Sequence, residues 1–289
     1  MYDFIQRFAF KSLPIKGAFV NLTDVWQTIQ KQKEYDSQIM KVIGELIVAN
    51  VLLTSSIKFD GKVIVQLQDN PNVDLVVSEC TNDMKIRATA KNWQVAEYAN
   101  YLNIGRLVIS IDSNKDGKMY QSIVAMAGNK SVSDALNNYM VQSEQLKTVF
   151  VLVATEKKLI GFMLQEMPDR GGSFLDDVKR VFMLAQTLRN QELLENDITS
   201  ILYKLFHEDD ILLFEPLAVE FSCTCGPDRV INMLHGLGYS EVSSIFLEQK
   251  EIRITCDFCN SVYIYQEDDV ARIFNNLSLD MDSVSKEVH

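Results

Sequence analysis

The chain has 289 residues, of which 47% are hydrophobic and 23% charged, a balance that excludes a mainly disordered or collagen-like protein. Its 39 acidic and 28 basic residues give a formal net charge of −11, which disfavours binding to nucleic acid and to anionic membranes. The length predicts about two domains. No apolar segment is expected to span a membrane, and the N-terminus lacks the layout of a signal peptide, so we expect a cytoplasmic protein.

The first 170 residues mix helical and strand patterns and predict an α+β fold class for an N-terminal domain, residues 1–172. Residues 1–9 and 25–33 are interpreted as short helices, the second with Asp24 as its N-cap. Residues 36–53 form a stronger helix, because their apolar side chains recur at i, i+3, i+4 and i+7. A further helix is predicted at 131–145, and strands at 63–68, 75–77, 84–90, 106–111, 120–126, 148–154 and 158–166.

The sequence changes character after Asp169–Ser173 (DRGGS), where we place a domain boundary. Two amphipathic helices, at 174–190 and 197–206, follow within a predicted linker, residues 173–221. Residues 174–220 carry ten acidic and four basic side chains, a net charge of −6. This segment is too small and too charged to form its own core, so its apolar stripes must dock on another surface. The stripes comprise Val181, Leu184, Leu188, Ile201 and Leu205.

Four of the five cysteines cluster in the last predicted domain, residues 222–289, which also contains a predicted strand at 262–266, a helix at 268–274 and a polar tail. They form Cys-x-Cys and, thirty residues later, Cys-x-x-Cys, and four thiolates suit a tetrahedral zinc ion. The predicted ligands are Cys223, Cys225, Cys256 and Cys259. Two alternatives remain open: a purely structural zinc module, and a thiol–disulfide oxidoreductase acting through Cys256 and Cys259.

The remaining signals favour ordinary structural roles. Residues 112–117 (DSNKDG) match the first half of a calcium loop, but Ile123 stands where a glutamate is required, so a hairpin turn is predicted. His207 and His235 are interpreted as ordinary surface or packing residues, and Cys80 as a free structural thiol. No phosphate-binding loop and no Gly-x-Ser-x-Gly motif is present, so neither nucleotide hydrolysis nor catalysis by a serine nucleophile is expected.

The cysteine pattern resembles that of the 33 kDa chaperonin family, the redox-regulated heat-shock holdases. Segments throughout the chain are also similar to this family, so the resemblance covers nearly the whole length. They are LTDVWQTI (22–29), GELIVANVLLTSSIKFDGKVIVQLQ (44–68), YMVQSEQL (139–146), GFMLQEMP (161–168), LYKLFHEDDILLFEP (202–216) and the final Val288–His289.

The resemblance implies a chaperone that answers oxidative stress. The reduced form would hold one zinc ion on the four clustered cysteines and be inactive. Oxidation would form Cys223–Cys225 and Cys256–Cys259 disulfides, release zinc and unfold the linker. The exposed apolar surface would bind unfolding proteins without ATP, and the oxidised chain would form a homodimer through its N-terminal domain.

Overall fold

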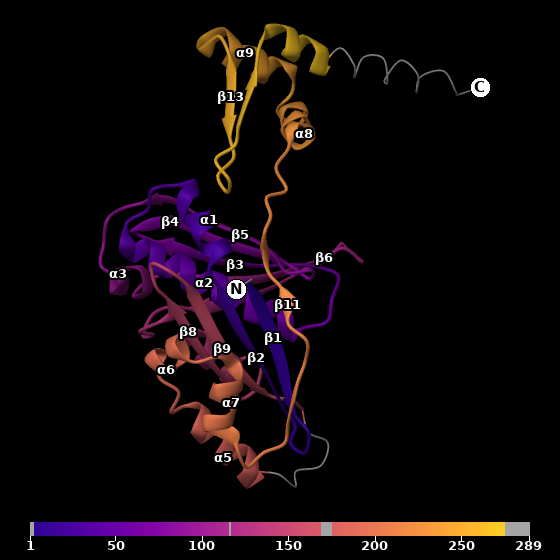
Figure 1. Cartoon of the computed structure of the whole chain (residues 1–289). Coiled ribbons are helices and arrows are strands. Elements are labelled where there is room, and N and C mark those ends of the chain that lie inside the picture. Colours follow the sequence, from indigo (N-terminus) through magenta and orange to yellow (C-terminus); the bar gives the residue numbers. More distant parts are fainter. Residues whose placement is uncertain (1–2, 116, 169–174, 275–289) are drawn as a thin grey trace, which may run out of the picture. The chain divides into compact units, whose positions relative to one another are not determined.

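The computed structural model describes residues 3–115, 117–168 and 175–274 (Figure 1). The chain divides into two compact units, Met1–Ser222 and Cys223–His289. Described residues of the predicted linker, from 175 onward, belong to the first unit. The predicted boundary at Asp169–Ser173 and the polar tail, 275–289, lie outside the described residues. The mixed α/β fold class and the small C-terminal unit with its cysteine cluster are confirmed.

The first unit contains two six-stranded sheets. In the first sheet, sheet A, the order is β10-β1-β2-β9-β8, β11 also pairs with β1, and every pairing is antiparallel. Its strands are β1 (Phe4–Phe10), β2 (Ile15–Leu22), β8 (Thr148–Ala154), β9 (Leu159–Glu166), β10 (Ile211–Leu213) and β11 (Leu217–Ala218).

The second sheet, sheet B, has the order β12-β5-β4-β3-β6-β7 and is antiparallel except for the parallel pair β12–β5. Its strands are β3 (Gly61–Asn70), β4 (Val73–Thr81), β5 (Lys85–Trp93), β6 (Arg106–Ser113), β7 (Met119–Ala125) and β12 (Glu220–Phe221). The predicted strands are therefore confirmed. The β6–β7 pairing also confirms the hairpin preferred over a calcium loop, although Asp116 lies outside the described residues.

Helix α2 (Ser37–Ser56) packs against strands of both sheets and forms the centre of the larger core. Its N-cap is Asp36, whose side chain accepts hydrogen bonds from two backbone N–H groups. A Cβ atom at Gly44 would lie 2.7 Å from Ala154 and Leu159, so glycine permits the close approach of helix and sheet. Contrary to our expectation, α2 is long enough and apolar enough to cross a membrane, and it is the one such helix among the described residues. Most of α2 is buried, however, as in the core helix of a folded domain.

The structure corrects the first predicted helix. Residues 4–10 form β1, because pairing with β2 on one side and with β10 and β11 on the other satisfies their backbone groups and buries Ile5 and Phe8. The expected cap is also corrected. Helix α1 (Asp24–Gln32) begins after Thr23, and the buried carboxylate of Asp3 accepts hydrogen bonds from the N–H groups of Thr23, Asp24 and Val25. This cap was not predicted because Asp3 lies far from α1 in the sequence.

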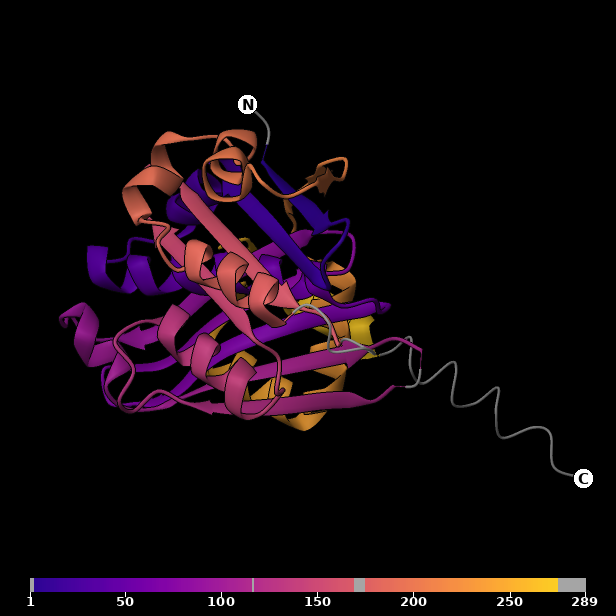
Figure 2. The ribbon, with the colours of Figure 1, turned by 90° about the horizontal axis from the view of Figure 1, so that it is seen from below.

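Three helices that follow the predicted boundary pack on sheet A, opposite α2 (Figure 2). They are α5 (Leu175–Ala185), α6 (Asn190–Glu195) and α7 (Ile198–Phe206). The helix predicted at 174–190 is confirmed over Leu175–Ala185 but is too long. A separate helix begins at Asn190, where the Glu192 carboxylate accepts a hydrogen bond from the Arg189 N–H group. The docking prediction is confirmed: Val181, Leu188 and Ile201 are buried.

Two further helices cover the first unit, α3 (Tyr98–Leu102) and α4 (Val132–Gln142), the latter capped by Ser131. Tyr98 of α3 donates a hydrogen bond to the buried carboxylate of Glu45 in α2. Burial raises the pKa of Glu45 to about 7, although the Tyr98 hydrogen bond, the charge of Lys41 and a backbone hydrogen bond from Val132 oppose this shift. Glu45 is therefore a titrating group in the main core.

This burial predicts a loss of stability as the pH rises. The folded chain holds the Glu45 proton more tightly than the unfolded chain, whose glutamate has a pKa of 4.5, so the stabilisation is complete below that value and is lost as pH rises to about 7. The difference amounts to about 3 kcal/mol. Glu45→Gln should remove this dependence, so its thermal unfolding midpoint should fall less than that of the parent between pH 5 and 8. Glu34→Gln, at an exposed position, is the control. If the unfolding midpoints of all three proteins changed equally with pH, the raised pKa of Glu45 would be contradicted.

Candidate metal centre

The second unit builds two short cysteine loops on a small framework. Its elements are α8 (Pro227–Leu237), α9 (Tyr239–Gln249), β13 (Ile252–Thr255), β14 (Val262–Tyr265) and a helical segment at 267–274. The predicted strand and final helix are confirmed. The sequence analysis missed α8 and α9, although Gly226 followed by Pro227 is a common helix start. The core of the unit is small and consists of Val230, Leu234, Val242, Ile252, Tyr265 and Val270.

The turn of the β13–β14 hairpin carries the second cysteine pair. The Cys256 N–H donates to the Ser261 carbonyl, and the Asn260 N–H donates to the Cys256 carbonyl, each at 2.9 Å. Asn260 adopts a left-handed backbone with φ of +57°, which asparagine tolerates better than most residues. The chain therefore makes a tight turn at Asn260. Gly226 after the first pair instead has extended backbone and caps α8.

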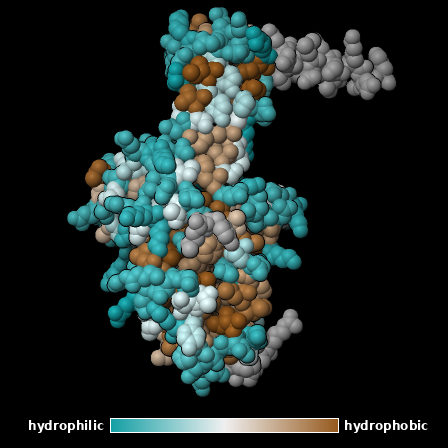
Figure 3. All heavy atoms as spheres, in the orientation of Figure 1, coloured by the Kyte–Doolittle hydropathy of each residue, from teal (hydrophilic) through white to brown (hydrophobic). Residues whose placement is uncertain are grey.

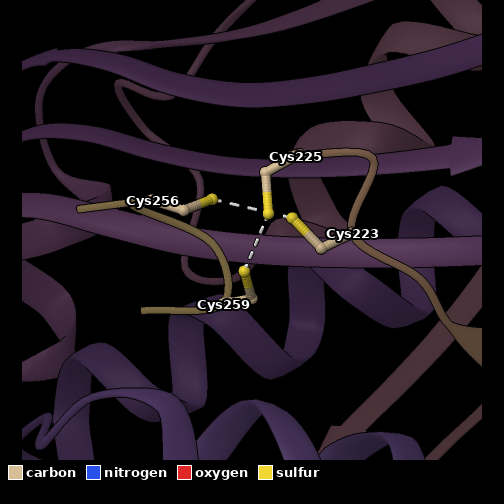
Figure 4. Close-up of side chains that lie close together, drawn as sticks. All are labelled: Cys223, Cys225, Cys256 and Cys259. Carbon is tan, nitrogen blue, oxygen red and sulfur yellow. Dashed lines mark hydrogen bonds between the residues drawn. The ribbon is translucent and has the colours of Figure 1, made fainter. Parts of the chain in front are cut away.

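All four sulfur atoms converge (Figure 4). Every pair lies within 4.8 Å; Cys225 Sγ is 3.2 Å from Cys259 Sγ, and Cys223 Sγ is 3.6 Å from Cys256 Sγ. A tetrahedral zinc site with Zn–S bonds of 2.3 Å places its sulfurs about 3.8 Å apart. The cluster can therefore hold a metal ion, and its donors and spacing fit zinc.

Burial and hydrogen bonding shift the pKa values of three of the thiols in different directions. Burial raises the pKa of Cys223 to about 12 and also raises the pKa of Cys256. For Cys259 burial acts in the same direction, but hydrogen bonds with the hydroxyl and backbone of Ser261 and with Cys225 and Cys223 outweigh it and lower the pKa to about 6. Among these three thiols, thiolate is favoured at Cys259. Thiolate is the form that binds metal and reacts with oxidants.

Tyr263 also belongs to the site, and the sequence analysis did not identify it. Its hydroxyl lies 3.2 Å from Cys225 Sγ and donates to it. This hydrogen bond raises the pKa of Tyr263 to about 12. The only signal in the sequence was the strand pattern VYIY, which does not show which side chain faces the sulfurs. Such outer contacts hold metal ligands in position.

The other candidate residues stay outside the four-sulfur cluster. Cys80 lies in β4 and is fully buried, and this burial raises the pKa of its thiol to about 12. It is a structural thiol, as predicted. The His235 ring packs edge-on against Phe274 with ring centroids 5.3 Å apart, and His207 follows α7 in the first unit. Both positions agree with the packing and surface roles expected for these histidines.

Comparisons with known proteins match nearly the whole chain to proteins of one family. Residues 3–266 match the family model described as Hsp33 protein. The chain is 38% identical to the 33 kDa chaperonin of Chromobacterium violaceum over 95% of its own length and 94% of the relative. It is 39% identical to that of Neisseria meningitidis serogroup A, covering 94% and 91%. A crystal structure of the 33 kDa chaperonin from Thermotoga maritima is similar in fold, with a TM-score of 0.82, 17% identity and coverage of 96% and 99%.

Proposed function

The chain belongs to the Hsp33 family of chaperones, and from this premise we propose that it is a redox-regulated, ATP-independent holdase of the cytoplasm rather than an enzyme. The observation that carries the proposal is the convergence of four thiols on one site in a chain of this family. Unfolding or oxidatively damaged proteins are its proposed partners, and the net charge of −11 argues against nucleic acids and anionic membranes.

The reduced form is proposed to hold one Zn²⁺ ion on Cys223, Cys225, Cys256 and Cys259. A bound zinc ion would supply a structural link between the two cysteine loops and keep the sulfurs as thiolates. The Tyr263 hydroxyl and the Ser261 hydroxyl would orient Cys225 and Cys259 by hydrogen bonds. These contacts support the ligand assignment.

Oxidation is proposed to convert the four thiols into two disulfides. For each disulfide, one thiolate attacks peroxide and becomes a sulfenic acid, and a second thiol displaces its oxygen as water. Two thiols and one hydrogen peroxide thus give one disulfide and two water molecules. Disulfide sulfurs no longer offer the charged donors that a zinc ion requires, so the site loses its affinity for metal.

The pairing Cys223–Cys225 and Cys256–Cys259 rests on the family resemblance. Proximity does not select it, since all four sulfurs lie within 4.8 Å and the Cys225–Cys259 and Cys223–Cys256 contacts join the two loops. We predict that peptide mapping of the oxidised chain by mass spectrometry finds both bridges within the loops. The matched control is the reduced chain alkylated before digestion, in which all four cysteines should carry the label. Bridges joining residue 223 or 225 to residue 256 or 259 would refute the pairing.

Loss of the metal is expected to unfold the second unit. Structural zinc contributes on the order of 10–16 kcal/mol to folding in small modules. A domain of this size has a total stability of roughly 3–10 kcal/mol, and the core here is small. The first cysteine lies two positions after β12, which pairs with β5. Unfolding of the second unit would therefore disturb the end of the linker, where β12 pairs with β5.

The proposed client surface is the apolar contact between α5, α6, α7 and sheet A. The helices contribute Val181, Phe182 and Ile201, and the strands contribute Phe8, Phe19 and Phe162, all fully buried. Release of the helices would expose both partners of this contact, flanked by the acidic side chains that keep a complex soluble. The oxidised chain is further proposed to form a homodimer through the N-terminal domain.

The direct test measures zinc release and client protection in the same samples. Reduced, zinc-loaded protein and protein treated with peroxide at mild heat are mixed with a heat-labile client, and aggregation is followed by light scattering. Suppression by the treated protein alone, with about one zinc released per chain, is the expected result. Zinc release without suppression would leave a redox-sensitive module that is not a chaperone switch. Catalytic turnover of a disulfide substrate would instead identify an oxidoreductase.

A further inference from the structure

A cavity of about 590 Å³ opens in the first unit where α2 ends between β1 and β2. Its described lining includes no acidic residue, although the chain as a whole is strongly acidic. Three cations line it instead: Arg7, Lys16 and Lys58. Among the described residues, no carboxylate lies within ion-pair distance of any of them. The cavity is therefore a cationic site on an anionic protein.

Lys16 is the central cation. Its ammonium group donates a 2.7 Å hydrogen bond to the Ser56 carbonyl at the end of α2, which leaves two N–H donors free for another acceptor. Lys16 pairs across the strands with Ala9, two residues from Arg7, so the two cationic side chains lie on the same face of sheet A. Burial and the charge of Arg7 both lower the pKa of Lys16. An anion between them would relieve this repulsion.

The rest of the wall is apolar and adaptable. Three methionines, Met84, Met163 and Met167, line it together with aromatic side chains, and methionine adjusts to ligands of varied shape. At the mouth, Phe214 and Leu217 are 42% and 40% exposed. Figure 3 shows apolar atoms exposed over β1 and the segment after α7, which contains these two residues.

A second cavity, of about 290 Å³, adjoins the first and shares Lys16, Ser56, Ile57 and Met167 with it. Its lining is mostly apolar, and Leu53, Ile109 and Tyr139 belong to it. It also contains two carboxylates, Glu144 and Glu166, which would repel an anionic group. A ligand with one charged end would thus place that end in the first cavity and its apolar end in the second. Together the two volumes suit a small organic ligand.

We infer that these joined cavities bind a small amphiphilic anion. Lys16, with Arg7 and Lys58, would hold its carboxylate or phosphate head group, and its alkyl chain would extend past Met167 into the second cavity. The site is complete in the described fold of the first unit and requires neither zinc release nor unfolding of α5–α7. It shares only Phe8 with the residues named for the proposed client surface.

Sodium dodecanoate is the probe, titrated by calorimetry below its micelle concentration into the full-length, reduced, zinc-loaded chain. We expect saturable binding of one dodecanoate per chain, at least tenfold weaker for hexanoate, which is too short to fill the second cavity. Binding should weaken with added salt, because the head group is held by charge. Dodecyltrimethylammonium, with the same tail and the opposite charge, should bind at least tenfold more weakly. Equal binding of the two detergents, or no saturable binding, would overturn the inference.

Variants and vesicles complete the test. Lys16→Gln and Lys58→Gln should each weaken dodecanoate binding, the first by at least tenfold, while Lys11→Gln removes a nearby exposed charge outside the cavity and should leave it unchanged. Unchanged binding in both cavity variants would refute the site. Phosphatidylglycerol vesicles distinguish a free ligand from a membrane head group: we expect no cosedimentation. If the chain bound vesicles but not dodecanoate, the three cations would form a membrane-binding surface and the ligand cavity would be refuted.

Discussion

Replacing Cys256 with serine is expected to abolish tight zinc binding and to make the chain hold clients without any oxidant. Serine removes one of four converging sulfurs, so the remaining three thiols lose the closed tetrahedral donor set that a structural zinc site needs. The metal contribution of about 10–16 kcal/mol exceeds the roughly 3–10 kcal/mol expected for a unit of this size. Zinc content by a colorimetric chelator, circular dichroism and client light scattering measure the three consequences together.

Cys80→Ala is the matched control for this experiment. It removes the fifth thiol, which is buried in β4 of the first unit, and should lower stability by about 1 kcal/mol while leaving zinc content and redox switching intact. If Cys256→Ser retained a full equivalent of zinc and an unchanged helical signal, the proposed coupling between metal and fold would fail.

Replacing Phe182 with alanine is expected to release α5 from sheet A and produce client holding in the reduced, zinc-loaded chain. The Phe182 ring is 1% exposed and packs in the second core, with the Lys147 ammonium 4.7 Å from its centroid. Deleting a ring buried to this extent costs about 3–5 kcal/mol. Limited proteolysis should cleave residues 175–206 faster, and client aggregation should decrease without peroxide.

The neighbouring Met183 provides the control on the same helix. Its side chain is 68% exposed, so Met183→Ala should change stability by less than about 0.5 kcal/mol and leave the reduced chain inactive. Rapid cleavage of the helices in Phe182→Ala without any gain in client protection would show that this apolar contact is not the client surface.

Local signals were sufficient for most elements of the first unit. The period of residues 36–53 predicted α2 because a helix is stabilised by neighbours three and four positions away. Alternating and continuous apolar segments predicted β3 to β9 for a similar reason, whereas β2 and the short strands β10, β11 and β12 were not predicted. Residues 4–10 were misread because their strand is specified by partners at residues 15–22 and 211–218.

The sequence by itself determined the chemistry of the candidate site. Four cysteines in two short pairs restrict the chain to metal or redox chemistry wherever they lie, because thiolates are the donors and the spacing closes a tetrahedron. The apolar stripes of residues 174–206 likewise required a docking surface. Only the tertiary structure decided which surface that is, the face of sheet A opposite α2, and only it placed Tyr263 beside Cys225 and gathered Arg7, Lys16 and Lys58 around one cavity. Those contacts join residues far apart in the chain, and their geometry follows from the packing of whole sheets and helices rather than from any local pattern.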